Sequence, residues 1–257
     1  MGDYAGAGLI AGVTFNERNE RRPIVENDLR FSQGLYSVPL AARLVGMHPS
    51  TLTTWANGYE RLAPGRPMVK QGPVITSVQS EDNRSIPFIG LVEATVVQAF
   101  RQTGLSLQRI RKALEVLSEQ GELNHALAAR LLYSDGANVL YDYARREGDL
   151  ALRMLTVVSN GQHVFHEVIE QYLTRITFGD EWATELILPV TDRQLLRARP
   201  TIANGDPLFV HGGAPLSAVR SRLQAGEPID SVGLDYGVPA DEIIEAMNAL
   251  WPQSLAA

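Results

Sequence analysis

The sequence predicts a mainly α-helical protein with small β elements, in the α+β class. Apolar residues recur at helical spacing in several segments, of which residues 88–101 are the most apolar. Shorter runs rich in β-branched and aromatic residues, such as 175–178, are strand candidates between the helices. The chain has 257 residues, which is enough for two domains or for one domain with appendages.

The composition is that of an ordinary globular protein, with 45% hydrophobic and 20% charged residues. The chain has no cysteine, which excludes disulfides, thiolate nucleophiles and cysteine-ligated metal sites and fits a reducing compartment. No apolar run approaches the length of a membrane span, and the N-terminus lacks the pattern of a signal peptide. We therefore expect a cytoplasmic protein without a membrane contact.

Residues 1–35 are predicted to form a flexible N-terminal arm. Residues 1–12 are rich in glycine and alanine without periodicity, and residues 16–30 mix charges of both signs with little apolar content. Such a composition does not supply enough apolar surface to fold in isolation. An arm that is swapped in a dimer or contacts DNA through its arginines is the alternative.

Residues 36–55 predict a helix-turn-helix. Gly46 ends the first helix because glycine takes the left-handed backbone conformation without steric cost. Pro49 lies in the first turn of a second helix, where its missing N–H has no helical partner to lose. Leu52 and Trp55 lie three residues apart in that second helix, so both can pack on the first. A second helix of this kind enters the DNA major groove, and an ordinary helical hairpin is the alternative.

A β-hairpin resembling a wing is predicted next, from residues 68–70 and 74–76 on either side of Gly72. Two helices follow at residues 88–101 and 107–120, with a break at a threonine and a glycine between them. A winged helix-turn-helix domain over residues 36–120 is therefore expected.

Positive charge is confined to the segment that carries the helix-turn-helix. Residues 36–112 hold nine Lys and Arg against four acids, whereas residues 1–35 hold four against five and residues 113–257 hold ten against twenty. The chain therefore contains a basic segment although its overall net charge is −6. Neutralising DNA phosphates requires a local basic surface rather than a basic protein, so this distribution supports DNA binding.

The order of these elements resembles a MerR-like winged DNA-binding domain. The resemblance includes residues 89–94 (IGLVEA) and 104–114 (GLSLQRIRKAL). More specifically, it resembles the N-terminal domain of VapB-type antitoxins, which are encoded beside PIN-domain toxins. The C-terminal part is similar to a small domain found in many antitoxins of that group, through residues 199–207, 213–215, 223–227 and 235–238.

Residues 121–198 are predicted to form a small central α+β platform that dimerises or links the two ends. Residues 162–173 predict an amphipathic helix with Val164, Val168, Ile169 and Leu173 facing inward. The strand candidates are rich in β-favouring residues and lie at 139–143, 154–158, 175–178 and 185–188.

Residues 199–257 are predicted to form a C-terminal three-helix domain with a helix-turn-helix-like shape. A short hairpin over residues 202–210 is expected around Asn204 and Gly205, which both tolerate positive φ. The last helix carries acidic residues and no Lys or Arg, so DNA would repel it, and a role in protein binding or dimerisation is the better interpretation. The three helices are expected at 215–224, 228–236 and 239–251.

The candidate DNA contacts divide into hydroxyls and cations. Hydroxyl groups can reach base edges or phosphates, whereas Arg and Lys neutralise phosphates. We expect base contacts from Ser50, Thr51, Thr53 and Thr54, and phosphate contacts from Arg43, Arg61, Arg66 and Lys70. MerR-like recognition helices commonly include Arg, and this one has none, which shifts specificity toward the wing and DNA shape.

The sequence gives little support for a metal site or for an enzyme active site. His163 and His166 are three residues apart, whereas helical zinc enzymes space paired histidines by four with a glutamate between them. His211 is followed by two glycines, but no nucleophile elbow accompanies it, and no phosphate-binding glycine loop is present. We therefore expect no metal, no cofactor, no catalytic residue and no enzyme.

The sequence thus predicts a DNA-binding antitoxin of a type II toxin–antitoxin system. The resemblance implies that the protein neutralises a PIN-domain ribonuclease toxin. It also implies that a homodimer represses its own operon by binding double-stranded promoter DNA. The alternative is a MerR-like, ligand-responsive transcriptional regulator without a toxin, and a third possibility is an interaction protein with a degenerate DNA-binding domain.

Overall fold

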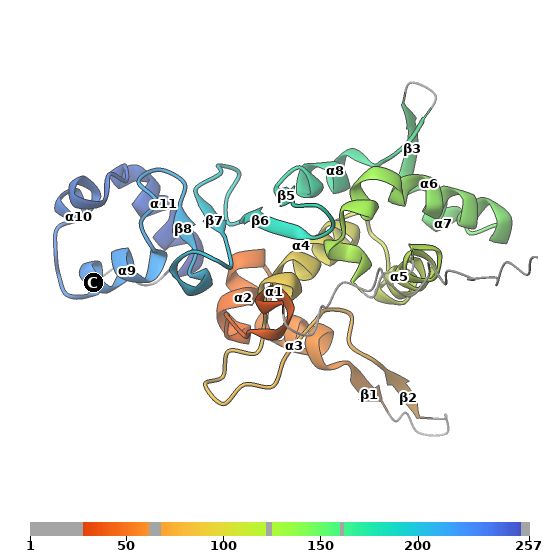
Figure 1. The fold of residues 1–257 in the computed structure, drawn as a ribbon, viewed down its shortest axis with the longest axis horizontal. Coiled ribbons are helices and arrows are strands. Elements are labelled where there is room, and N and C mark those ends of the chain that lie inside the picture. The colour runs from red at the N-terminus through yellow and green to blue at the C-terminus, as the bar shows by residue number, and fades with distance from the viewer. Residues whose placement is uncertain (1–27, 62–67, 122–124, 160–161, 253–257) are drawn as a thin grey trace, which may run out of the picture.

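The computed structural model describes residues 28–61, 68–121, 125–159 and 162–252 (Figure 1). These residues are mainly helical with three small antiparallel sheets, which confirms the predicted α+β class. None of the helices in the described ranges is long and apolar enough to cross a membrane.

The helix-turn-helix is formed by α2 (Val38–Val45) and α3 (Pro49–Asn57). Ser37 begins α2 by accepting a hydrogen bond from the backbone N–H of Leu40 at 3.4 Å. Gly46 ends α2 in the left-handed conformation with φ 74°, as the sequence predicts. Leu52 and Trp55 of α3 are buried in the core. Residues at the helix ends, close in sequence to the helices, therefore determine where the motif begins and turns.

The wing differs from the predicted hairpin. Strand β1 (Tyr59–Arg61) pairs with β2 (Val69–Gln71), with Tyr59 opposite Gln71, so the prediction that residues 68–70 pair with 74–76 is wrong. The backbone N–H groups of Val74 and Ile75 instead donate to the carbonyl of Trp55, at 2.7 and 3.3 Å. Burial of Ile75 pulls this segment back onto α3 and leaves β2 free to pair with β1.

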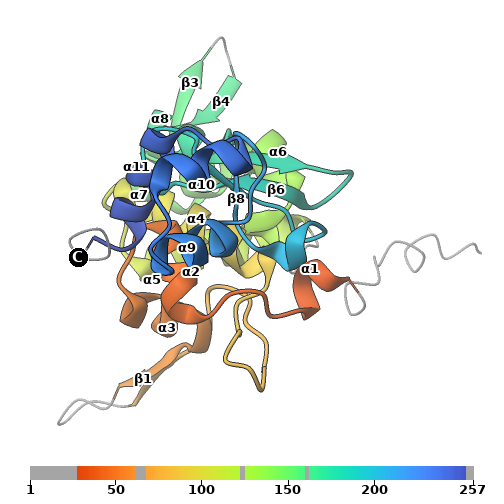
Figure 2. The same ribbon diagram turned by 90° about the vertical axis from the view of Figure 1, so that its left-hand side faces the viewer.

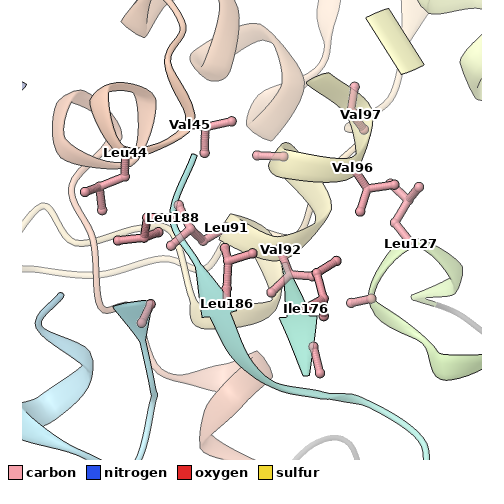
Figure 3. Close-up of a cluster of buried hydrophobic side chains, with 14 of the residues drawn as sticks. Leu44, Val45, Leu91, Val92, Val96, Val97, Leu127, Ile176, Leu186 and Leu188 are labelled. Atoms are coloured by element: carbon pink, nitrogen blue, oxygen red, sulfur yellow. The ribbon is translucent and has the colours of Figure 1, made fainter. Parts of the chain in front are cut away.

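Helix α4 (Phe88–Gln102) is the centre of the core and is buried along nearly its whole length. Figure 3 shows Leu91 and Val92 of this helix between Val45 of the helix-turn-helix and Leu186 of the largest sheet. Helix α5 (Leu107–Gly121) follows α4. One continuous cluster of buried apolar residues therefore joins the N-terminal and C-terminal halves.

Part of the segment predicted as an arm also belongs to this core. Residues 28–35 include the short helix α1 (Leu29–Ser32), and Phe31 and Leu35 are buried. Residues 1–27 lie outside the described residues. The predicted division into parts at residues 120 and 198 stays a prediction.

The central part contains more helix than the sequence predicts. Residues 139–143 lie within the long helix α6 (Arg130–Glu147), so the strand prediction there is wrong. Leu140 and Ala144 are buried four residues apart, which is helical periodicity hidden within a β-favouring run. A 3-10 helix, η2 (Ala126–Ala128), precedes α6, and the short α7 (Leu150–Arg153) follows it.

A two-stranded hairpin stands where a longer helix is predicted. Strand β3 (Thr156–Ser159) pairs with β4 (Gln162–Phe165), so a helix over 162–173 is wrong in its first part. His166 ends the hairpin and caps α8 (Glu167–Leu173), because its Nδ1 accepts the N–H of Val168 at 3.4 Å. The strand predicted at 154–158 is correct only from Thr156 onward.

The largest sheet has four antiparallel strands in the order β5-β6-β7-β8. The strands predicted at 175–178 and 185–188 overlap the first two. The predicted hairpin over 202–210 is wrong, because the last strand pairs with β7 around a 3-10 turn, η3 (Ala203–Gly205). The positive φ expected at Asn204 and Gly205 is present, at 54° and 76°. The strands are β5 (Ile176–Phe178), β6 (Ala183–Ile187), β7 (Leu196–Ala198) and β8 (Leu208–Phe209).

The three C-terminal helices are confirmed close to their predicted bounds, as α9 (Leu216–Gln224), α10 (Ile229–Tyr236) and α11 (Ala240–Leu250). Figure 1 shows them gathered at one end of the molecule, the end that faces the viewer in Figure 2. Gly237 takes the left-handed conformation between the last two helices, which produces the predicted helix-turn-helix-like shape.

Candidate DNA-binding surface

Helix α3 lies on the lower face of the molecule in both ribbon views. The wing formed by β1 and β2 projects from one side of this helix, and a loop over residues 77–85 projects from the other (Figures 1 and 2). Val78 N–H donates to the Ser85 carbonyl at 2.9 Å and closes this 77–85 loop. The face therefore has a helix between two projections, a shape that suits the groove of a duplex.

The four predicted hydroxyl contacts lie on α3 but differ in what they can still bind. Ser50, Thr51 and Thr53 are exposed and Thr54 is half-buried. Thr53 Oγ1 donates to the Pro49 carbonyl at 3.0 Å, and Thr54 Oγ1 donates to the Ser50 carbonyl at 2.9 Å. Both threonines therefore keep only acceptor capacity for a ligand.

Ser50 and Thr51 lie in the first turn of α3. The Ser50 hydroxyl lies 2.8 Å from Nδ1 of His48, the residue that caps the helix. The Thr51 hydroxyl has no hydrogen-bond partner within the described residues. Thr51 is thus the hydroxyl on α3 that remains free both to donate and to accept.

Of the four predicted phosphate contacts, the structure describes the side chains of Lys70 and Arg43. Lys70 on β2 is exposed, and its Nζ lies 2.7 Å from Oε1 of Glu60, its partner in the strand register. Arg43 on α2 lies over the Trp251 ring, with its guanidinium carbon 6.0 Å from the ring centroid. Arg66 and the side chain of Arg61 lie outside the described residues.

Arg111 on α5 supports the wing and was not among the predicted contacts. Its Nη1 donates to the Pro73 carbonyl at 3.4 Å, and its Nη2 is buried with no partner in the described part of the chain. Burial lowers the pKa of Arg111, and the neighbouring Tyr59 and Glu115 offset part of this effect. Arg109, Arg111 and Lys112 form a basic cluster near the start of α5 in the sequence, but only the fold brings Arg111 to the segment that follows the wing.

The acidic C-terminal helix is held by the side chains of Arg193 and His211. The Arg193 guanidinium hydrogen-bonds Asp241 at 2.9 Å and Glu242 and Glu245 at 3.0 Å each. The hydrogen bond from Arg193 lowers the pKa of Asp241. His211 Nδ1 also lies 2.8 Å from Oε1 of Glu242. The carboxylates of α11 therefore help to fasten it to the loop before β7 and to the turn after β8.

The described residues contain no group of three or more His, Asp or Glu placed to hold a metal ion. His166 caps a helix, and the side chain of His163 lies outside the described residues.

Comparison with known proteins agrees with this surface. Residues 34–114 match a family described as "Putative DNA-binding HTH domain". Over 234 residues the chain is 37% identical to a Mycobacterium tuberculosis protein named "Putative antitoxin VapB45", covering 88% of this chain and 97% of that protein. The crystal structure of Rv2018 from Mycobacterium tuberculosis matches with a TM-score of 0.71 and 35% identity, over 85% of this chain and 99% of that one.

Proposed function

The chain belongs to the family of the antitoxin VapB45, and on this premise we propose that it is the DNA-binding antitoxin of a type II toxin–antitoxin system. The likeness extends over 97% of the relative and 88% of this chain, and the family match places a DNA-binding helix-turn-helix domain at residues 34–114. The observation that carries the proposal is the exposed α3 between two projections, within the segment that matches a DNA-binding family.

DNA binding is proposed to use a homodimer on the protein's own promoter. Two copies would place their recognition helices in successive major grooves, about 34 Å apart. Thr53 and Thr54 would accept hydrogen bonds from base amino groups, since their own hydrogens are engaged with the helix. Thr51 and Ser50 would contact base edges or phosphates near the start of α3. Phosphate contacts are assigned to Arg43, Arg61, Arg66 and Lys70.

The partner is proposed to be a PIN-domain ribonuclease toxin. The name of the relative supports the antitoxin role, and the family resemblance supports the class of toxin. The surplus of acidic residues after residue 112 supports a protein partner rather than DNA for this half of the chain.

The antitoxin role is tested by co-expression with the product of the neighbouring gene. We expect a tagged toxin to co-purify with this chain and its ribonuclease activity to fall in the complex. A toxin that purifies alone, or a neighbouring gene of another class, would remove the antitoxin proposal and favour the ligand-responsive regulator.

DNA binding is tested separately by mobility shift on the upstream DNA at two salt concentrations. Affinity should fall steeply with salt, because phosphate neutralisation releases counterions. The variant Thr51→Ala should weaken binding, whereas Arg145→Ala, which removes an exposed charge on α6, should leave it unchanged. Binding that is absent or insensitive to salt would leave only the protein-interaction role.

A further inference from the structure

A cavity of about 600 Å³ opens beside the helix-turn-helix, and none of the residues proposed above to contact DNA lines it. Three segments far apart in the sequence line it: residues 35–40 before and within α2, residues 82–84 of the 77–85 loop, and residues 203–218, which run from η3 into the first turn of α9. Its volume lies within the range of about 300–1,000 Å³ that is typical of small-molecule sites.

One wall of the cavity is fixed by a buried hydrogen bond. The Tyr36 hydroxyl donates to the Gly205 carbonyl at 2.7 Å and joins the start of the helix-turn-helix to the C-terminal part. Burial raises the pKa of Tyr36, and the negative charge of Asp206 raises it further. The Tyr36 hydroxyl therefore stays protonated and lies within the field of Asp206.

Hydrogen bonds hold one carboxylate oxygen of Asp206 and leave the other open to a ligand. Its Oδ2 accepts the backbone N–H of Ser217 at 3.2 Å and the Ser217 hydroxyl at 2.5 Å. Its Oδ1 has no hydrogen-bond partner within the described residues. A carboxylate that is fixed through one oxygen and open through the other is suited to accept an N–H donor from a ligand.

Apart from Asp206, the charged residues that line the cavity form a pair of opposite sign. Arg84 Nε lies 3.5 Å from Oδ2 of Asp82, so this wall contributes an ion pair. The charge of Asp206 is left over, and the cavity as a whole is negative by one unit. The apolar part of the lining comes from Leu35, Leu40, Pro207 and Pro215.

Backbone strain is concentrated around the same space. Within the described residues, positive φ in non-glycine residues occurs at Asn83 (62°), Ala203 (49°) and Asn204 (54°), and all three line this cavity. Asparagine tolerates this conformation because its side chain can hydrogen-bond locally, whereas alanine has no such group, so the strain lies mainly at Ala203. Strained backbone of this kind clusters at ligand sites, because the surrounding fold holds it in a binding geometry.

We propose that this cavity binds a small aliphatic amine, with its ammonium group on Asp206 Oδ1 and its carbon chain against Leu40, Pro207 and Pro215. A cation matches the unpaired negative charge, and a short hydrocarbon chain matches the apolar wall. The inference is independent of the toxin, because it depends only on residues of this chain.

The test is isothermal titration of the purified full chain with n-propylamine, n-butylamine and n-pentylamine. The uncharged 1-butanol serves as a control of the same length as n-butylamine. We expect saturable binding of at least one amine, and at least tenfold weaker binding of the alcohol, which corresponds to about 1.4 kcal/mol. Absence of saturable amine binding at millimolar concentration, or equal binding of the alcohol, would overturn the proposal.

Substitutions of residues that line the cavity test whether the amine binds there. Asp206→Asn removes the charge but keeps an acceptor for Ser217, and it should weaken amine binding at least tenfold. The control Asp192→Asn removes an exposed carboxylate outside the lining and should have no effect. A second variant, Ala218→Leu, fills part of the cavity without changing charge and should also weaken binding. Circular dichroism verifies that each variant folds, and folded variants that bind like the wild type would place the amine elsewhere.

Discussion

The carboxylate of Glu93 on α4 lies 3.0 Å from Nδ1 of His125, with only 4% of the glutamate exposed. Its second oxygen accepts the backbone N–H of Thr76 at 2.5 Å, and the Thr76 hydroxyl lies 2.9 Å from the same histidine nitrogen. The His125 ring in turn packs on Phe31, with ring centroids 4.8 Å apart. One buried carboxylate thus joins the central helix to the segment after the wing and to the segment before η2.

Replacing this carboxylate should destabilise the fold. Glu93→Leu leaves the N–H of Thr76 without its acceptor, and we expect the free energy of unfolding to fall by about 1–3 kcal/mol. Glu93→Gln keeps an acceptor and should lose less. Urea denaturation measures both, with the exposed Glu115→Gln as the control. An unchanged midpoint for Glu93→Leu would show that the contact adds no net stability.

Gly90→Ala should also destabilise the protein, although alanine is the better helix former. A Cβ at this position of α4 would lie 2.2 Å from the backbone carbonyl oxygen of Thr76, so the helix and the segment after the wing would have to separate. The expected loss exceeds the gain of about 1 kcal/mol from helix propensity. Thermal denaturation tests this, and a higher midpoint for Gly90→Ala would contradict the close approach.

Lys70 and Glu60 form an ion pair on the wing, and we expect replacement of each to change the affinity for DNA in opposite directions. Lys70→Gln should weaken binding to all sequences and reduce the salt slope by about 1, because one phosphate contact is lost. Glu60→Gln should strengthen binding, since it removes a carboxylate from the wing and frees Lys70. Mobility shift over a salt series separates them, with Glu170→Gln on α8 as the control. Equal affinities for all three variants would place the wing away from the phosphates.

Arg193 should make the stability of the protein dependent on pH in acid. Its hydrogen bond lowers the pKa of Asp241 in the folded protein below the unfolded value of about 3.9. The contribution is therefore complete above that value and is lost as the pH falls through the lowered folded pKa. Arg193→Gln should be less stable than the wild type at neutral pH, and the difference should shrink below about pH 4. Urea midpoints at several pH values measure this, and a constant difference would exclude an electrostatic cause.

Ala203→Gly should stabilise the protein, in contrast to most alanine-to-glycine changes. The left-handed conformation at Ala203 costs about 1–2 kcal/mol, whereas the added freedom of glycine in the unfolded chain costs about 0.4–1 kcal/mol. The difference between these two ranges is a net gain of up to about 1.6 kcal/mol. The control Ala225→Gly, at φ −75°, should lower stability instead. Equal losses in both variants would mean that Ala203 is not strained.

Elements with local signals could be predicted from the sequence, because their ends depend on neighbouring residues. Gly46 and Gly237 end helices in the left-handed conformation, and Pro49 opens α3 from within its first turn. The helix-turn-helix and the three C-terminal helices therefore agree with the predicted bounds. The position of the hydroxyl residues on α3 follows from the same local signals.

Where a segment had two possible partners, only the tertiary structure decided between them. Ile75 is buried against α3 instead of pairing with β2, and Leu140 is buried along a helix although its neighbours favour a strand. The cavity around Asp206 likewise depends on three distant segments that meet only in the fold. The sequence by itself determined the local helices and the basic segment. Tertiary packing decided strand partners, ion pairs and cavities, because their free energies depend on contacts between residues far apart in the chain.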